Sequence, residues 1–231
     1  ANIVSESAIE AVGTKDKKIY FHSDGTGGFF VKNTTSPSTL DYVEFDNLSN
    51  PQSDNWSLTG AVTFYEAEVS FSNCIFKNNL SEDAINMVRC KVYINNCLVS
   101  NTFSDAIDFD FSSGKIENTT VENIQNDGLD FSGSHVELLN INLSSIGDKA
   151  ISSGENSFAT LENITIRGAF IGIASKDKSM IKSDNIVIVN TKYPFAAYQK
   201  KPEYGPASII VNNFKNKIEK TASLIEKNSL L

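Results

Sequence analysis

Apolar and polar residues alternate along most of this chain, in short runs that return at a fixed interval. Val92 and Ile94 are the apolar positions of one run, and Val136 and Leu138 are those of a later one. A period of two is typical of β-strands with one buried face. The pattern therefore predicts a chain built mainly of short strands.

An asparagine marks each repeat of this pattern. Successive members are separated by 23, 22, 22, 23 and 22 residues, and they are Asn73, Asn96, Asn118, Asn140, Asn163 and Asn185. Asparagine tolerates the left-handed backbone of a tight turn, and stacked amides can hydrogen-bond to one another. The repeat predicts an all-β fold, a right-handed parallel β-helix (solenoid) with coils of about 22 residues.

A column of small residues supports the same register. Its members lie 22 residues apart, and each is followed by an apolar residue; they are Ala84, Ala106, Gly128, Ala150 and Gly172. An earlier coil fits the pattern with an insertion near residues 48–58. We therefore expect residues 1–215 to form a single solenoid domain.

The two ends of a solenoid need covering, because an open end coil exposes core and strand edges. Residues 5–12 carry Ala8, Ile9 and Val12 at helical spacing, which predicts a short N-terminal helical cap. Residues 216–231 lose the alternating pattern. Leu224 and Ile225 there lie on one face of a predicted C-terminal helical tail or cap.

Composition narrows the range of partners. The net charge of −8 and the isoelectric point near 4.8 argue against a nucleic-acid partner. No run of 18 apolar residues occurs, so membrane insertion is not expected. Cys74 and Cys97 share a column one coil apart, where we expect stacked core thiols, with a disulfide as the alternative.

Aspartates gather around the small-residue column. Asp83, Asp105 and Asp127 each precede a small residue, and Asp108, Asp130 and Asp110 follow on the outward side of the same predicted strands. Carboxylates stacked at the strand spacing of about 4.8 Å repel one another. Three interpretations remain open: a solvated acidic face, a Ca²⁺ site with Asp83, Asp105 and Asp127 as ligands, or an acid pair that processes carbohydrate. No cofactor is required by the last of these.

Residues 126–175 resemble the pectin-lyase-like superfamily, and polygalacturonases in particular. The resemblance is carried by NDG at 126–128, GDK at 147–149 and FIG at 170–172, on three successive coils. It implies hydrolysis of polygalacturonan by a trio of aspartates supported by a histidine. Asp127 and Asp148 match the first two aspartates, whereas Lys149 stands in place of the third and Ile171 in place of the histidine.

These departures argue against an active polygalacturonase. If the chain is an enzyme, the resemblance leaves a polysaccharide hydrolase or a lyase. In a lyase, Lys149 would be the base and Ca²⁺, held by Asp127, Asp130 and Asp148, would neutralise a uronate. The D-P-H-D signature of mannuronan epimerases, which share the fold, is missing.

Two insertions carry aromatic residues. Trp56 lies within residues 48–60 and Tyr204 within residues 199–206. Each ring could stack on a sugar, or each loop could simply cover an end of the solenoid. The ligand-binding set that we predict is Asp108, Asp110, Asp130, Lys176, Trp56 and Tyr204.

Two functions follow from these features. The first is a secreted or cell-surface β-solenoid that binds, or modifies, a polysaccharide or cell-surface glycan along an acidic groove. The second is a non-catalytic structural module, such as a stalk, a fibre or filament subunit or an adhesin segment, for which self-association is expected. An incomplete catalytic set with abundant asparagine suits the second function as well.

Overall fold

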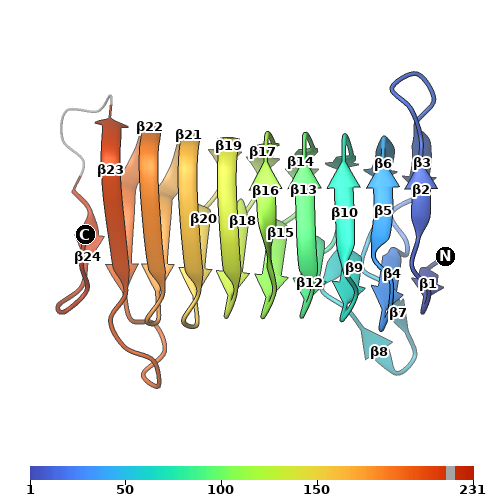
Figure 1. The fold of residues 1–231 in the computed structure, drawn as a ribbon, viewed down its shortest axis with the longest axis horizontal. Helices are drawn as coiled ribbons and strands as arrows, with labels where there is room; N and C mark the ends of the chain where they lie inside the picture. The colour runs from blue at the N-terminus through green and yellow to red at the C-terminus, as the bar shows by residue number, and fades with distance from the viewer. Residues whose placement is uncertain (217–221) are drawn as a thin grey trace.

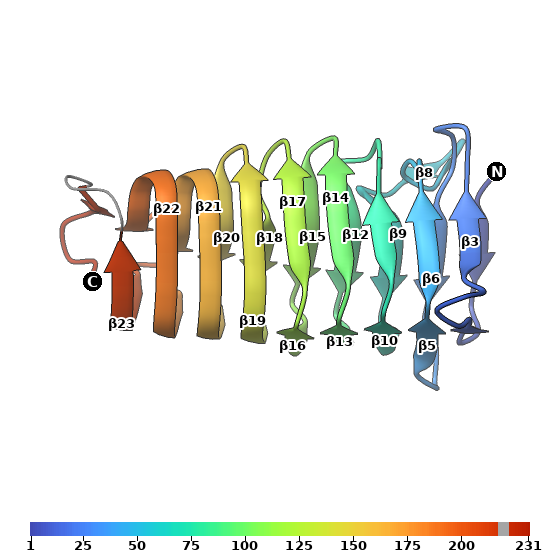
Figure 2. The same cartoon turned by 90° about the horizontal axis from the view of Figure 1, so that it is seen from above.

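The structure, a computed structural model, describes residues 1–216 and 222–231. The strands stack in parallel into an elongated solenoid, with the termini at opposite ends (Figures 1 and 2). Successive coils pair residue by residue about one repeat apart, as Val69 does with Val92. The predicted all-β parallel solenoid is therefore confirmed.

Each coil contributes one strand to each of three parallel sheets. The first sheet, nearest the viewer in Figure 1, contains β2 (Glu10–Val12), β5 (Ser38–Asp41), β10 (Val69–Ser72), β13 (Lys91–Asn95), β16 (Ser113–Glu117) and the starts of β19 (His135–Ile146), β21 (Phe158–Lys176), β22 (Met180–Tyr198) and β23 (Ser208–Asn216). The second sheet contains β3 (Ile19–His22), β6 (Val43–Asp46), β11 (Ile75–Lys77), β14 (Leu98–Thr102), β17 (Thr120–Ile124) and the later parts of β19, β21, β22 and β23.

The third sheet carries the aspartate columns. It contains β1 (Ile3–Ser5), β4 (Phe29–Lys32), β9 (Gly60–Tyr65), β12 (Asp83–Val88), β15 (Asp105–Asp110), β18 (Leu129–Ser132), β20 (Lys149–Gly154), the ends of β21 and β22, and β24 (Leu224–Ile225).

The turn between the first and second sheets is made by the asparagine column. Its residues adopt a left-handed backbone, with φ between 52° and 57°. The amide nitrogen of Asn96 donates to the Asn73 amide oxygen at 2.6 Å, and Asn140, Asn163 and Asn185 each donate to the preceding member. The turn thus needs a residue that accepts positive φ, and the stacked amides join one coil to the next.

A second turn column, which the repeat pattern did not reveal, lies between the second and third sheets. Asn78, Asn101, Asn123 and Asn190 also have positive φ there, and Asn123 donates to Asn101 at 3.3 Å. Ser145 and Gly168 occupy the intervening coils. These two exceptions hide the column from a search for repeated asparagine.

The core is a stack of side chains along the solenoid axis. Phe45 stacks on Phe76 with ring centroids 4.9 Å apart, and aliphatic residues continue the core toward the C-terminus. Cys74 and Cys97 are buried in the same column as free thiols. The expectation of stacked core thiols is confirmed, and the disulfide alternative is not.

The expected N-terminal helix is wrong. Residues 5–12 contain the end of β1 and the whole of β2, in which Ala11 is buried and Val12 is exposed. β2 pairs with β5, so the backbone amides of the first coil find partners in the next coil. Strand pairing therefore outweighs the helical spacing of three apolar residues in so short a segment.

The expected C-terminal helix is also wrong in the part that the structure describes. β23 extends to Asn216, and residues 222–231 contain β24 and a bridge between Ser208 and Leu230. The part of this expectation that falls on residues 217–221, including Ile218, lies outside the described residues. The described tail continues the third sheet and does not leave the solenoid.

Two insertions project from the same edge of the solenoid (Figure 1). One is the hairpin of β7 (Gln52–Ser53) and β8 (Trp56–Ser57), and the other follows β22 and spans residues 199–207. Among the described residues, no helix has the length and apolar character needed to cross a membrane.

Candidate functional site

Charged side chains are concentrated on the outer surface of the third sheet, on β12, β15, β18 and β20. Ile107 and Phe109 of β15 point into the core, so Asp108 and Asp110 point outward. Asp108 pairs in register with Asp130 of β18. We call this outer surface, from Asp83 to Lys176, the acidic face.

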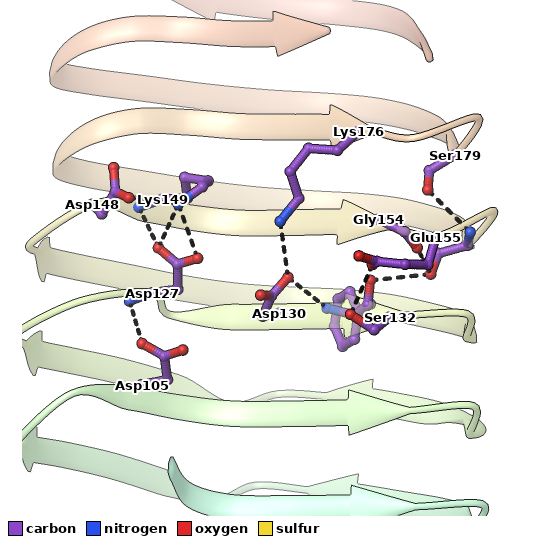
Figure 3. Close-up of polar contacts among 12 residues, drawn as sticks. Asp105, Asp127, Asp130, Ser132, Asp148, Lys149, Gly154, Glu155, Lys176 and Ser179 are labelled. Carbon is purple, nitrogen blue, oxygen red and sulfur yellow. Dashed lines mark hydrogen bonds and ion pairs between the residues drawn. The ribbon is translucent and has the colours of Figure 1, made fainter. Parts of the chain in front are cut away.

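Lys149 lies beside Asp127 and Asp148 on the acidic face (Figure 3). Its ammonium is 3.1 Å from both carboxylate oxygens of Asp127 and 2.5 Å from Asp148. The Asp127 side chain, only 5% exposed, also accepts the backbone N–H of Lys149 at 2.9 Å. Asp105 accepts the backbone N–H of Asp127 in the same way at 2.9 Å.

Lys176 reaches the acidic face from a more C-terminal coil. Its ammonium is 3.7 Å from Asp130, and its side chain is only 7% exposed (Figure 3). The absence of a side chain at Gly154 makes room for it, since a Cβ there would lie 3.3 Å from Lys176 Cε. Lys176 is therefore buried, and Lys149 partly buried, against at least one carboxylate on an outward-facing surface.

The remaining predicted carboxylates lie on the coils before Asp130. Asn86 donates to Asp108 at 3.2 Å and to Asp110 at 3.4 Å, so one amide bridges the two carboxylates. Asp83 is buried in the column of Asp105 and pairs with it in register.

Burial shifts the acidity of these groups. Removal from water raises the pKa of Asp127 to about 6, against the opposing attraction of Lys149, and that of Asp83 to about 7. Burial together with the neighbouring Asp110 raises the pKa of Asp108 to about 9, and burial also raises the pKa of Asp110. At neutral pH Asp108 therefore keeps its proton, and Asp83 is about half protonated.

Lys149, in contrast to these carboxyls, remains charged. Burial opposes the charge of Lys149, but the attraction of Asp127 and the hydrogen bond to Asp148 outweigh it and raise the Lys149 pKa well above its usual range. Lys149 is thus held as an ammonium.

The carboxylates that lie close enough together to hold a cation differ from the set expected from the sequence. Carboxylate oxygens of Asp105, Asp127 and Asp130 lie within 4.8 Å of one another, a set from which Asp83 is absent. Both oxygens of Asp127 already accept from Lys149. A cation held by this set would therefore have to share Asp127 with the ammonium, and the Ca²⁺ site stays a prediction.

The two aromatic residues of the insertions lie on separate loops, one before and one after the acidic face along the chain. Trp56 packs on Phe30 with ring centroids 6.0 Å apart, and Phe30 pairs in register with Thr63 at the N-terminal end of the third sheet. Tyr204 lies in the loop after β22, where its backbone N–H donates to the Lys201 carbonyl. Trp56 and Tyr204 therefore belong to opposite ends of the third sheet.

A polar group at the edge of the acidic face was not predicted from the sequence. Glu155 accepts from the Ser132 hydroxyl at 2.8 Å (Figure 3), and it also pairs with Lys201 at 2.6 Å. The buried Asp177 accepts the backbone N–H groups of Lys200 and Lys201 at 2.6 Å each. Glu155 and Asp177 occupy left-handed corners 22 residues apart, and that spacing is the signal that could have revealed them.

Comparison with protein families identifies one match. The family described as the right handed beta helix region matches residues 7–166. No curated protein matches the chain.

Several solved structures share the fold. A periplasmic alginate epimerase is similar over 100% of this chain and 70% of its own, with a TM-score of 0.55 and 12% identity. A pectin methylesterase from Aspergillus niger is similar over 97% of this chain and 80% of its own, with a TM-score of 0.53 and 12% identity. At these identities the likeness shows the fold alone.

A third similar structure is longer than this chain. The catalytic domain of a GH87 α-1,3-glucanase in complex with tetrasaccharides gives a TM-score of 0.48 and 11% identity, covering 100% of this chain. The chain spans 63% of that domain's length.

Proposed function

Because the chain belongs to the right-handed β-helix family, we propose that it binds a polysaccharide along the acidic face of the third sheet. The observation that carries the proposal is a pair of lysines, the buried Lys176 and the partly buried Lys149, each held against carboxylates on an outward-facing surface. Charged groups on the outside of a sheet are normally solvated, so buried ones mark a surface prepared for a polar ligand.

The chemistry of the acidic face suits sugar hydroxyls. Carboxylates such as Asp130 accept hydrogen bonds from hydroxyls, and an ammonium such as that of Lys176 donates to them. Both side chains extend from paired strands, so they are positioned before a ligand arrives. One protein of the same fold is an alginate epimerase, and alginate is a carbohydrate, which agrees with a glycan ligand.

Binding is favoured over turnover. A hydrolase of the inverting type needs one carboxyl as acid and another as base, whereas Asp127 and Asp148 here share the same ammonium. A lyase would need Lys149 as a neutral base, and the raised pKa keeps it protonated. We therefore propose a binding module that leaves its polysaccharide intact.

We place this module outside the cytoplasm, secreted or at a cell surface. The similar alginate epimerase is a periplasmic protein, and polysaccharides are abundant in such compartments. The ion-paired carboxylates of the acidic face also suit the second candidate, a structural module of a stalk or fibre. In such a module the ion pairs would only hold the coils together.

A binding experiment distinguishes the polysaccharide-binding module from the structural module. We expect the purified chain to bind members of a panel of acidic and neutral polysaccharides, with Asp130→Asn and Lys176→Met each weakening binding at least tenfold. Glu162→Gln, an exposed carboxylate on the first sheet, is the matched control and should bind like the unmodified chain. Reducing-sugar and unsaturated-uronate assays on the same panel should detect no product.

Three results would contradict the proposal. If no polysaccharide binds, the structural module stands instead. If Asp130→Asn and Lys176→Met bind normally, the ligand lies elsewhere. Release of reducing ends or unsaturated uronates would show that the acidic face is catalytic.

A further inference from the structure

We propose that the outer surface of the first sheet carries a second ligand site, which takes a neutral oligosaccharide. The site is a hollow of about 650 Å³ that crosses β10, β13, β16, β19 and the start of β21. This volume is within the range of small-molecule sites, about 300–1,000 Å³. In Figure 1 the strands of the first sheet lie nearest the viewer, and the strands of the acidic face lie behind them.

The floor of the hollow centres on Ser113 of β16, whose small side chain faces outward. The neighbouring Gly114 is in register with the buried Val92, so it faces the core, and a Cβ there would sit 2.1 Å from the Val92 carbonyl oxygen. This glycine lets the backbones of two coils approach closely. Lys91 and His135 are the register partners of Ser113 on either side, so the floor is a gap between longer side chains.

Aromatic rings stand at the two ends of this floor. Tyr93, 36% exposed, lies on the N-terminal side, and its hydroxyl is hydrogen-bonded to Glu117, which holds the ring in place. Phe158 lies on the C-terminal side, with its ring centroid 6.4 Å from that of His135. Aromatic faces pack against the apolar C–H face of a sugar, and a ring that is already held loses little freedom on binding.

The charges around the hollow select a neutral sugar over an anionic one. Two lysines, Lys91 and Lys115, are balanced by two glutamates, Glu68 and Glu137. Lys115 is paired with Glu117 at 2.5 Å, whereas Lys91 and Glu137 form no ion pair with any described residue. A rim with equal numbers of donors and acceptors suits hydroxyl groups, and it offers no excess of positive charge for a polyuronate.

The test is titration of the ¹⁵N-labelled full chain with cellohexaose, maltohexaose, mannohexaose and hexagalacturonate. We expect at least one neutral hexasaccharide to shift the amide signals of β13, β16 and the start of β19. Tyr93→Ala should weaken that binding about five- to tenfold through loss of ring stacking. Ser113→Trp should abolish it by filling the floor, with an unchanged far-ultraviolet circular dichroism spectrum showing that the variant folds.

The control is Tyr20→Ala, which removes a ring that is 64% exposed on β3, outside the hollow, and should bind normally. The amides that shift separate this site from the acidic face, so either proposal can fail alone. The inference is overturned if no neutral hexasaccharide shifts first-sheet amides, or if hexagalacturonate binds there more tightly. It is also overturned if sedimentation shows a dimer that Ser113→Trp abolishes, because a second copy of the chain would then occupy the hollow.

Discussion

At the scale of single residues, burial decides how the charges of the acidic face behave. The sequence placed Asp127 in the NDG motif and Asp148 and Lys149 in the GDK motif one coil later, and in the structure both carboxylates accept from the Lys149 ammonium. The sequence could not predict that Lys176 reaches Asp130. Lys176 lies two coils further along the chain, and its side chain must pass over Gly154. Register predicts which Cα atoms are neighbours, but not how far a long side chain extends from its own column.

Asp83 offers a test of the cost of burial, because its pKa is raised from 3.8 to about 7 chiefly by removal from water. The folded chain holds this proton to a higher pH than the unfolded chain. The contribution of Asp83 to stability therefore falls as pH rises from about 4 to about 7 and then levels off. We expect Asp83→Asn to match the unmodified chain at pH 4 and to be about 4 kcal/mol more stable at pH 8.

Urea denaturation at pH 4, 6 and 8 measures this difference. Asp16→Asn, an exposed aspartate before β3, is the control and should leave the pH dependence of stability unchanged. A stability difference between Asp83→Asn and the unmodified chain that stays constant across the three pH values would contradict the assignment of a buried, protonated carboxyl.

At the scale of elements, the sequence predicted the strands and the asparagine turn between the first and second sheets. It did not predict the strands at the two ends of the solenoid. Strand alternation and the asparagine column are repeated in coil after coil, so each copy reinforces the register of the others. Residues 5–12 have no such repetition, and the residues that alternate inward there are Ile9 and Ala11, whereas Val12 of the predicted helical face is exposed. The second turn column was missed because Ser145 and Gly168 satisfy the same backbone geometry without being asparagine.

The asparagine turn contributes to the free energy of unfolding in two ways, through its hydrogen bonds and through its left-handed backbone. Both contributions can be measured at Asn140. Its amide donates to Asn118 and accepts from Asn163, both at 3.0 Å, and its φ is 56°. Asn140→Gly removes the two hydrogen bonds but keeps an easy left-handed backbone, so it should cost about 1–2 kcal/mol. Asn140→Ala adds the strain of a left-handed alanine and should cost about 1 kcal/mol more. Equal free energies of unfolding for the two variants would show that the turn geometry carries no strain.

At the scale of the whole molecule, each coil touches chiefly the coil before it and the coil after it. The strands of the first sheet pair in steps of one coil, as β10 does with β13 and β13 with β16. The stability of such a solenoid is approximately a sum over coils and the interfaces between them. Functional surfaces are then assembled by register, since the acidic face and the first-sheet hollow each draw side chains from several consecutive coils.

Removal of one complete coil tests this additivity. Deletion of residues 96–117 joins Asn95 to Asn118, so that β11 meets β17 and β12 meets β18 with inward and outward positions unchanged. We expect a folded chain with the same circular dichroism per residue, a cooperative thermal transition and a lower melting temperature. Deletion of residues 96–106, half a coil, should leave no native-like transition, because it puts strands of different sheets on top of one another. A chain that unfolds after loss of the complete coil, or that tolerates the half-coil deletion equally well, would contradict a fold whose stability is local to neighbouring coils.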